Sequence, residues 1–360
     1  MLTGQVIQTT IEGIRGITHA SLAVCDTTGR VINQTGEIRD INERIVEAFA
    51  ISDAIEQSVG NMIMYKVFDD HEAEYVVVGM SEEQNARMSV RLAALQVESL
   101  SRAYKESFDK DNFIKNLLLD NMLLIDIYNR ARKLHIDINA ERAVYITEIS
   151  GSETLAQDIM RKIFPQELGD FVTTVEEKNI ILIKKLHDED HKKELNQYAE
   201  MMRRALFAQG INSRIAYGSA VKEIKEVSRS YKEAKLALDV GRIFYDEKQI
   251  VAYSNLGIGR LIYQLPINLC RMFITEIFKD KSPEDFDEET LMTIQRFFEN
   301  NLNVSETSRQ LFIHRNTLVY RLDKLERSTG LDLRVFDDAI TFKIALMVVK
   351  YMEYIEKTNY

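Results

Sequence analysis

Two short amphipathic patterns between Asn303 and Gly330 constrain this chain more than any other feature. In each pattern, apolar or small residues recur at a spacing of four and then three: Val304, Ser308 and Leu311 in the first, and Leu318, Leu322 and Leu325 in the second. Each pattern predicts a helix with one buried stripe. Only residues 311–314 join the two helices, so they must meet at a tight corner. The segment therefore predicts a helix-turn-helix.

The second of these helices would turn a polar face away from Leu318. The residues that we expect to contact DNA from this helix and its start are His314, Arg315, Asn316, Thr317, Tyr320, Arg321 and Lys324. Arginine and asparagine can form paired hydrogen bonds with guanine and adenine edges, and a threonine near a helix start can hold a phosphate. The alternative is a helical hairpin with a purely structural role, whose exposed face is polar only because it contacts water. Such a hairpin would show the same spacing.

The charge of this segment differs from that of the whole chain. Residues 303–334 carry six basic and four acidic side chains, a local charge of +2, whereas the complete chain carries −10. Contact with phosphates requires a positive field only where the contact is made. The overall negative charge argues against a protein that coats nucleic acids or membranes, because such proteins need a broad basic surface.

The string IHRNTLVYRLDKLERSTGLDL at 313–333 resembles the C-terminal helix-turn-helix of the PucR and CdaR-type (carbohydrate diacid regulator) transcription regulators. The same helix is similar to the DNA-bending protein Fis, in which the positions of Arg315 and Thr317 contact DNA. Val319 and Tyr320 stand where Fis is basic. The resemblance implies a homodimeric regulator that binds double-stranded DNA and responds to a small-molecule effector.

Length and composition indicate several folded domains. With 360 residues, of which 45% are hydrophobic, the chain can form two or three domains with separate cores. Cys25 and Cys270 are far apart in sequence, so they predict neither a disulfide framework nor a cysteine metal cluster. A cytoplasmic location fits this usage. No signal peptide begins the chain, and no apolar run approaches the ~18 residues that span a bilayer.

Residues 1–81 alternate helix and strand patterns and predict an α/β domain. We expect helices at 2–14 and 41–55 and strands at 21–25, 30–34, 62–68 and 73–80, in one sheet with helices on one side. This order resembles small sensor modules of the PAS, GAF or roadblock kind, which implies a site for a small molecule. His19, Arg30, Arg39 and Arg44 could hold a carboxylate, although ordinary surface residues are the simpler interpretation.

Residues 82–140 predict a helical linker that also dimerises. Met88, Leu92 and Leu95 follow coiled-coil spacing until Ser99, after which the apolar positions shift through Leu100, Tyr104 and Phe108. A second helix is expected at 112–134. We expect it to be buried, because its run LLLDNMLLI is apolar on nearly every side.

Residues 141–260 predict a second α/β domain. The expected strands are 143–149, 171–175, 180–185 and 213–218, and the expected helices are 154–163, 192–208 and 226–241. This layout, with SYKEAKLAL at 230–238, resembles the degenerate GGDEF-like (nucleotide-cyclase-like) domain of PucR-type regulators. An active cyclase has a glycine pair and metal-binding carboxylates in the hairpin between its paired strands. Here that hairpin, Val175–Asn179, has no glycine pair and carries Lys178. The resemblance therefore implies a structural or dimerising module.

Two further patterns carry weaker signals. His187 and His191 are four residues apart, which could place two imidazoles on one helix face for a metal, but HDEDH is not the zinc-protease pattern and predicts a solvated acidic loop. Gly257-Ile258-Gly259 lacks the third glycine of a dinucleotide loop and predicts only the start of a helix. We therefore expect no metal, no cofactor and no catalytic residue.

The chain is thus expected to be a mixed α/β and α protein. The expected parts are a sensor domain at 1–81, a helical linker at 82–140, a degenerate GGDEF-like domain at 141–260 and an all-α helix-turn-helix domain at 284–360. The expected function is ligand-responsive transcription regulation of a catabolic operon, with a sugar diacid-like or related small metabolite as effector. The alternative is a nucleotide-handling signalling enzyme or an adaptor that uses the cyclase-like domain.

Overall fold

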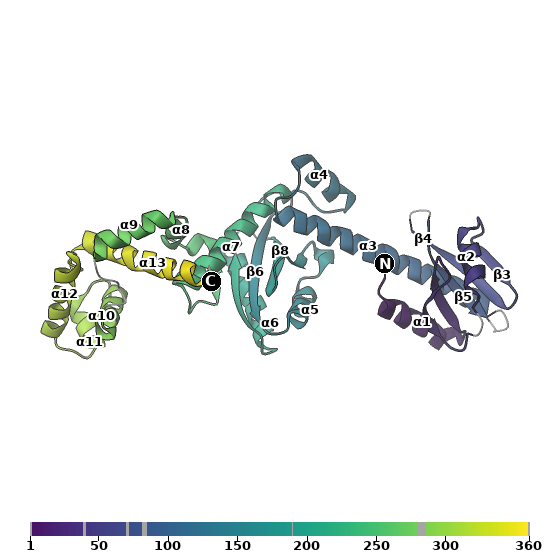
Figure 1. Ribbon diagram of the computed structural model, residues 1–360, viewed down its shortest axis with the longest axis horizontal. Coiled ribbons are helices and arrows are strands. Elements are labelled where there is room, and N and C mark those ends of the chain that lie inside the picture. The colour runs from purple at the N-terminus through teal and green to yellow at the C-terminus, as the bar shows by residue number, and fades with distance from the viewer. Residues whose placement is uncertain are drawn as a thin grey trace. The chain divides into compact units, whose positions relative to one another are not determined.

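A computed structural model describes residues 2–38, 41–69, 72–80, 85–188, 190–279 and 286–358. The chain divides into two compact units, Met1–Ile114 and Lys115–Tyr360. Each unit is built around a mixed α/β core, and the second unit continues into an all-helical end (Figure 1). This agrees with the mixed α/β and α class that the sequence predicts.

The first unit is a five-stranded antiparallel sheet with helices on both faces. Its elements are α1 (Gly4–Thr18), β1 (Leu22–Asp26), β2 (Val31–Thr35), α2 (Glu43–Ile51), β3 (Glu56–Val59), β4 (Met62–Asp69), β5 (Glu72–Met80) and the first part of α3 (Ala86–Leu118). The strand order is β2-β1-β5-β4-β3. The edge strand β3 is absent from the sequence prediction.

Alternate residues of β1 enter two different cores. Leu22 and Val24 pack with residues of α1 and α3, whereas Ala23 and Cys25 pack with Val46 and Phe49 of α2. The expectation of helices on one side only is therefore wrong. A strand that is covered on both faces is apolar at successive positions, as Leu22–Cys25 is.

Helix α3 is longer and the next helix shorter than predicted. α3 runs without a break from Ala86 to Leu118, and α4 spans only Leu124–Lys133. The chain leaves α3 through Asp120, whose φ of 61° is left-handed. The expected buried helix at 112–134 is therefore wrong, and Leu123 and Ile125 of the apolar run are 72% and 67% exposed.

The second unit contains a five-stranded mixed sheet. Its elements are β6 (Arg142–Ser150), α5 (Glu153–Ile163), β7 (Phe171–Thr174), β8 (Asn179–Lys185), α6 (His191–Phe207), β9 (Asn212–Tyr217), α7 (Val227–Phe244) and β10 (Ile250–Ala252). The strand order is β10-β9-β6-β8-β7, and only the β9–β10 pair is parallel. The predicted strands and helices of this domain are confirmed, except that the short β10 was not predicted.

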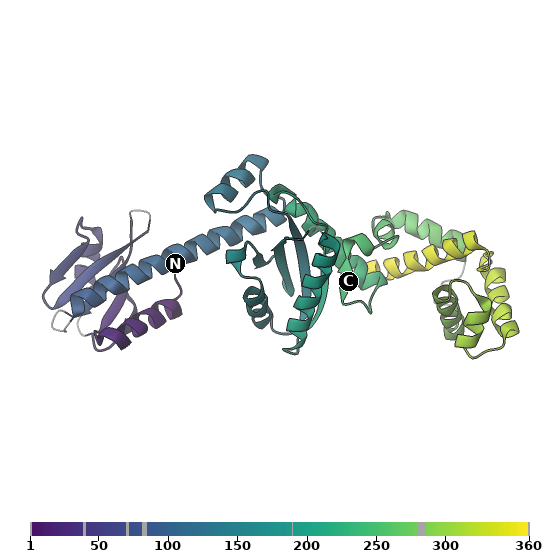
Figure 2. The same cartoon turned by 180° about the vertical axis from the view of Figure 1, so that it is seen from behind.

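Helices cover both faces of this second sheet (Figure 2). α5 and α6 pack on the side chains of Tyr145 and Leu182, and α7 packs across β6 and β9. α7 approaches β9 closely at Gly218, where a Cβ atom would lie 2.1 Å from the carbonyl oxygen of Ser230. The Ser230 hydroxyl accepts a hydrogen bond of 3.0 Å from the amide of Val144, which ties α7 to the sheet.

The helical end packs around two apolar clusters. The elements of this end are α8 (Gly259–Tyr263), α9 (Ile267–Phe278), α10 (Glu288–Glu299), α11 (Val304–Gln310), α12 (Arg315–Thr329) and α13 (Phe336–Thr358). Phe278 of α9, Phe297 of α10 and Phe342 of α13 lie in the first cluster with the leucines of α12, and the second cluster joins α8 to α9 and α13. α13 also packs on α7 and α8, so the helical end and the second sheet belong to the same unit. As expected from the sequence, Gly259 begins a helix.

Candidate nucleic-acid interface

The helix-turn-helix that the sequence predicts is present as α11 and α12. Leu318, Leu322 and Leu325 are 0%, 2% and 2% exposed and lie in the core with residues of α9, α10 and α13. α11 packs on α12, and both pack on α10. The turn between them is the four-residue segment 311–314. The buried stripe thus fixes which face of α12 remains in solvent.

Side chains cap both helices of this motif. The Asn303 side chain accepts a hydrogen bond of 3.0 Å from the amide of Glu306 at the start of α11. His314 begins α12, where its Nδ1 accepts a bond of 3.2 Å from the amide of Asn316. Gly330 ends α12 with a φ of 81°, a left-handed conformation that glycine adopts without steric cost. These caps satisfy amides and carbonyls that a helix end leaves unpaired.

The exposed side chains of α12 gather at its N-terminus. His314, Arg315, Asn316 and Thr317 are all exposed, and Tyr320 is 62% exposed one turn later. Among the residues that the structure describes, none bonds to the side chains of Arg315, Asn316 or Thr317. Partial positive charge on the amides of a helix start also favours a phosphate there. This end of α12 can therefore donate hydrogen bonds to another molecule.

Two of the residues predicted to contact DNA pair with residues of α10 and its N-cap in this structure. Arg321 donates to Thr293 at 3.0 Å and to the carboxylate of Glu289 at 2.8 Å, and its side chain is only 22% exposed. Lys324 lies 3.3 Å from the carboxylate of Asp287, in an ion pair whose side chains are 61% and 55% exposed. An exposed pair of this kind contributes little stability, so Lys324 can exchange its partner more readily than Arg321.

Arg334 neutralises the acidic residues of α12. Its guanidinium lies 2.8 Å from the carboxylate of Asp323 and 3.0 Å from that of Glu326, and it also pairs with Asp332 at 2.7 Å. The bond from Arg334 lowers the pKa of the Asp332 carboxyl group. Because these acids are paired, they repel DNA less than their number suggests.

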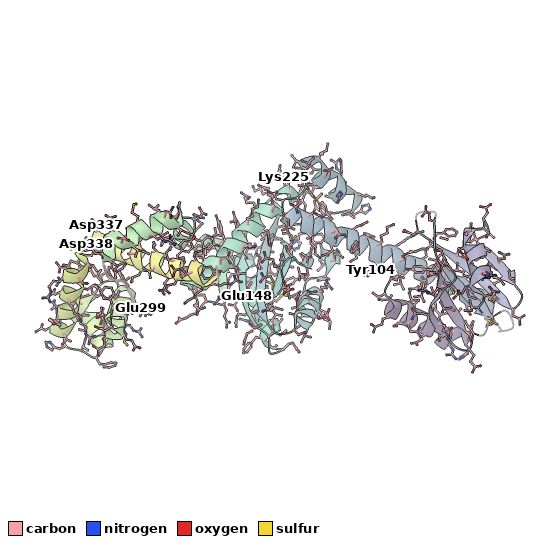
Figure 3. All side chains as sticks on the ribbon, viewed as in Figure 1. Tyr104, Glu148, Lys225, Glu299, Asp337 and Asp338 are labelled. Carbon is pink, nitrogen blue, oxygen red and sulfur yellow. The ribbon has the colours of Figure 1, made fainter. Side chains whose placement is uncertain are left out.

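Side chains bond to the carboxylates in and beside the described hairpin between β7 and β8. Glu176 bonds to Lys235 of α7, which lowers the pKa of the Glu176 carboxyl group, and it accepts a bond of 3.2 Å from Asn179. Glu148 near the end of β6, labelled in Figure 3, pairs with Arg242 at 2.6 Å. The space among these side chains is about 20 Å³, close to that of a single water molecule.

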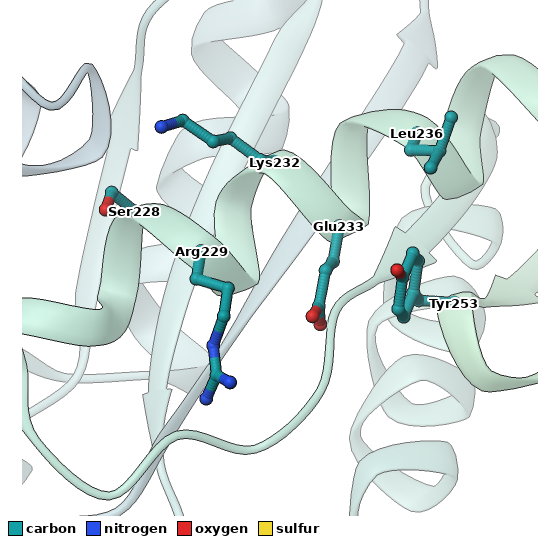
Figure 4. A pocket seen from close by; sticks show the side chains of 6 residues that line it. All are labelled: Ser228, Arg229, Lys232, Glu233, Leu236 and Tyr253. Atoms are coloured by element: carbon teal, nitrogen blue, oxygen red, sulfur yellow. The ribbon is translucent and has the colours of Figure 1, made fainter. Parts of the chain in front are cut away.

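A shallow hollow lies on the outer face of α7 (Figure 4). It measures about 360 Å³ and is lined by Ser228, Arg229, Lys232, Glu233, Leu236 and Tyr253. Arg229 pairs with Glu226 at 3.3 Å, and Lys232 pairs with Asp120 at 2.7 Å. Glu233 adds a carboxylate to the same lining, so the hollow is not a purely cationic site for an anionic ligand.

The weaker histidine and carboxylate-binding candidates do not come together as sites. His191 opens α6 and lies 2.6 Å from Glu141, whereas His187 precedes the helix. Among the described ranges, no three His, Cys, Asp or Glu side chains are close enough to hold a metal ion. His19, Arg30 and Arg44 are exposed, and Arg39 lies outside the described residues.

Sequence reasoning missed two residues that the structure makes notable. Lys66 is buried on β4 beneath α2, where it donates to the carbonyl of Ser52 and lies 5.0 Å from the ring centre of Phe49. Burial lowers the pKa of its ammonium group. Phe312, in the turn before α12, is 96% exposed. The sequence alone places Lys66 on the outer face of a strand. Its burial becomes evident only when α2 is known to cover that face of the sheet.

Comparison with known proteins assigns two parts of the chain. Residues 290–348 match the PucR C-terminal helix-turn-helix domain, and residues 122–240 match the GGDEF-like domain. The chain carries the two domains of a PucR-type transcription regulator. The PucR-type assignment confirms the resemblance expected from 313–333 and from the layout of the middle domain.

Named relatives agree with the PucR-type assignment. The chain is 26% identical over 296 residues to the carbohydrate diacid regulator of Escherichia coli K12, which covers 76% of each chain. It is 29% identical over 142 residues to the proline-responsive transcriptional activator PutR of Bacillus subtilis, covering 38% of this chain and 34% of that one. It is 25% identical over 126 residues to the purine catabolism regulatory protein of Bacillus subtilis, covering 35% and 24%. These matches support a DNA-binding transcriptional regulator of the CdaR/PucR family. No helix within its described residues is long and apolar enough to cross a membrane.

Proposed function

We propose that this protein is a homodimeric, effector-responsive regulator that binds an operator with α12 and controls a catabolic operon. The observation that carries the proposal is the free N-terminal end of α12. Arg315, Asn316 and Thr317 are exposed there without side-chain partners in the described part of the chain, on a helix whose opposite face is buried. Free hydrogen-bonding groups on a rigid helix are what base recognition in a major groove requires.

The proposed contacts divide by chemistry. They comprise His314, Arg315, Asn316, Thr317, Tyr320, Arg321 and Lys324. Arg315 and Asn316 would read base edges, because guanidinium and amide groups pair with guanine and adenine. Lys324 would contact a phosphate after leaving Asp287. Arg321 contributes less in this proposal, since it would have to leave two partners on α10.

The proposed homodimer forms along α3. Met88, Leu92 and Leu95 keep a coiled-coil spacing and are 70%, 44% and 59% exposed, while the other face of the helix packs on the first sheet. Tyr104, labelled in Figure 3, and Phe108 are 44% and 58% exposed further along α3, but they lie beyond the shift at Ser99 and do not continue this stripe in register. A second copy is the proposed occupant, because an identical helix offers the matching stripe. Two copies would also present two recognition helices to two half-sites.

The proposed effector is a small metabolite of the sugar diacid kind. Its class is taken from the Escherichia coli relative, which is named a carbohydrate diacid regulator and aligns over 76% of both chains. In the proposed mechanism, effector binding to the sensor domain at 1–81 shifts α3, which crosses into the second unit. That shift would change the spacing of the two copies of α12. We place the protein in the cytoplasm, where a DNA-binding regulator meets its operator.

In this proposal the GGDEF-like domain has a structural role and couples the sensor domain to the helix-turn-helix, and it does not catalyse a reaction. Support comes from the hairpin carboxylate Glu176, which is bonded to Lys235, and from the space of about 20 Å³ beside it. α7 of this domain packs on α13 of the helix-turn-helix end, so a movement of one reaches the other within a single unit.

Mapping the sites that the protein occupies on its own genome tests this proposal. We expect a small number of sites upstream of genes for catabolism of one class of metabolite, with occupancy or transcription changing when that metabolite is supplied. Uniform occupancy without preferred sites would contradict the proposal. Preferred sites beside genes unrelated to small-molecule use would contradict the operon and effector, while leaving DNA binding intact.

A further inference from the structure

We propose that Phe312 is a further DNA contact of this protein, and that its ring packs against the 5-methyl group of a thymine beside the bases read by α12. The inference rests on the proposed function, because it extends the surface with which α12 meets DNA. It adds an apolar specificity contact to a set of contacts that is otherwise made of polar and charged groups.

The first observation is the exposure of the ring. Phe312 is 96% exposed, more than any other large apolar side chain among the described residues. It lies in the turn of the helix-turn-helix, whose neighbours Leu311 and Ile313 turn inward against the apolar cluster of the helical end. An exposed aromatic ring costs free energy in water unless a partner covers it.

The second observation is the backbone at this residue. Phe312 has a φ of 53°, a left-handed conformation that is rare for a bulky residue. Its amide donates to Arg309 at 3.2 Å, and the amide of Ile313 donates to Ser308 at 3.1 Å. These bonds form the helix-ending turn in which glycine is the preferred residue.

Other helices in the described part of the chain end in the same way, with Asp120 after α3, Gly210 after α6, and histidine or asparagine after two more. After α4, His135 has a φ of 55° and the next amide donates to Ala131 at 2.8 Å. After α10, Asn301 has a φ of 52° and the next amide donates to Phe297 at 2.9 Å. Asparagine and histidine are enriched in this conformation, whereas phenylalanine is not. The fold therefore gains nothing from a phenylalanine at 312, which indicates a role outside the chain.

The position of Phe312 indicates DNA as the partner. Phe312 precedes the cap residue His314 by two positions, next to the helix end that enters the groove. Arg309 and Arg315 flank it in sequence. The Arg309 side chain is 77% exposed, and its ion pair with Glu306 is a surface pair that contributes little stability and can give way to a phosphate. A purely apolar protein partner would have to cover these cations, whereas a DNA groove offers phosphates for them and thymine methyl groups for the ring.

Replacing Phe312 by glycine separates stability from binding. We expect full-length Phe312→Gly to melt about 2–4 °C higher, because glycine removes the strained side chain. We expect it to bind about 5- to 20-fold more weakly to a duplex that the wild-type protein selects from a randomised pool. The dependence of binding on salt should not change, since no phosphate contact is lost.

Matched variants and modified DNA complete the test. His135→Gly removes a side chain from the equivalent helix-ending turn after α4, and it should leave the affinity for the duplex unchanged. Phe312→Tyr keeps the ring and should retain most of the affinity. Replacing thymines of the selected duplex by deoxyuridine removes only methyl groups. At one thymine position, this change should lower the affinity of the wild-type protein about as much as Phe312→Gly does. It should not lower the affinity of the Phe312→Gly variant any further.

Several results would overturn the inference. Unchanged affinity of Phe312→Gly would show that the ring serves something other than DNA, such as a protein partner. A loss of affinity with no response to deoxyuridine at any position would exclude the thymine contact. If the wild-type protein selected no sequence from the pool, the proposed function would fail as well. In the first two results the proposed function stands, so the two failures can be told apart.

Discussion

Arg315 and Lys324 lie on the same helix, and we expect them to contact different parts of the DNA. Arg315→Ala should weaken operator binding by about 1–3 kcal/mol and relax the preference at one base position, because a paired bond to guanine is lost. Lys324→Ala should weaken binding to all sequences about equally and lower the salt slope by roughly one, as expected for a phosphate contact. Affinities for single-base variants of the operator across a salt series measure both effects. If both variants changed base preference and salt dependence in the same way, the proposed base contact of Arg315 and phosphate contact of Lys324 would be contradicted.

Leu318 supports the interface without touching DNA. It is 0% exposed in the core of the helical end, so Leu318→Ala should lower the free energy of unfolding by about 2–5 kcal/mol. Thermal or denaturant unfolding of the full chain measures this. Stability equal to that of the wild type would show that the stripe of α12 is not packed as described.

At the scale of residues, the sequence predicted the buried stripe of α12 but not the partners of its polar side chains. The spacing of Leu318, Leu322 and Leu325 is a helical period, which is visible in the sequence. The bonds from Arg321 to Glu289 and Thr293 depend on how α10 crosses α12, which no local pattern contains. The left-handed backbone of Phe312 could likewise not be predicted from the sequence, because phenylalanine rarely adopts this conformation.

Helix α3 is the element that should control assembly. Leu95→Glu places a charge in the exposed apolar stripe and should shift the protein from dimer to monomer, because a buried unpaired carboxylate is costly. Gln96→Glu adds the same charge beside the stripe and serves as the control. Sedimentation at micromolar concentration distinguishes the two. A wild-type protein that sediments as a monomer would refute dimerisation through α3.

The hairpin between β7 and β8 should not support cyclase chemistry. Glu176 is bonded to Lys235, and Lys178 occupies the turn with a φ of 66°. Purified protein given GTP and magnesium should therefore form no cyclic dinucleotide, as judged by mass spectrometry. Detection of such a product, and its loss in Glu176→Gln, would instead support the enzyme alternative.

At the scale of elements, strong periodicity decided which predictions held. The middle domain was predicted nearly complete, because its strands are apolar runs and its helices have clear stripes. β3 was not predicted because Glu56–Val59 is a polar edge strand without a buried face. β10 was not predicted because it has only three residues. The second covered face of β1 was also missed, although Leu22–Cys25 is apolar at every position.

The whole molecule joins its DNA-binding end to the GGDEF-like domain by direct packing. Tyr263 of α8 donates to Asp239 of α7 at 3.1 Å, and Asp239 also pairs with Arg242 at 3.0 Å. Partial burial raises the pKa of the Asp239 carboxyl group, and the bond from Tyr263 and the charge of Arg242 oppose that rise. α13 packs on the same helix, so α7 contacts both the sheet of this domain and the helical end.

Sequence-specific binding to a duplex tests the central claim most directly. The measurement is the affinity of the full-length protein for an operator from genomic mapping and for a scrambled duplex of equal length, across a salt series. The account predicts that the operator binds at least ~10³-fold more tightly at physiological salt, and that both affinities fall steeply as salt rises. Equal affinity for the two duplexes, or no binding to either, would contradict it.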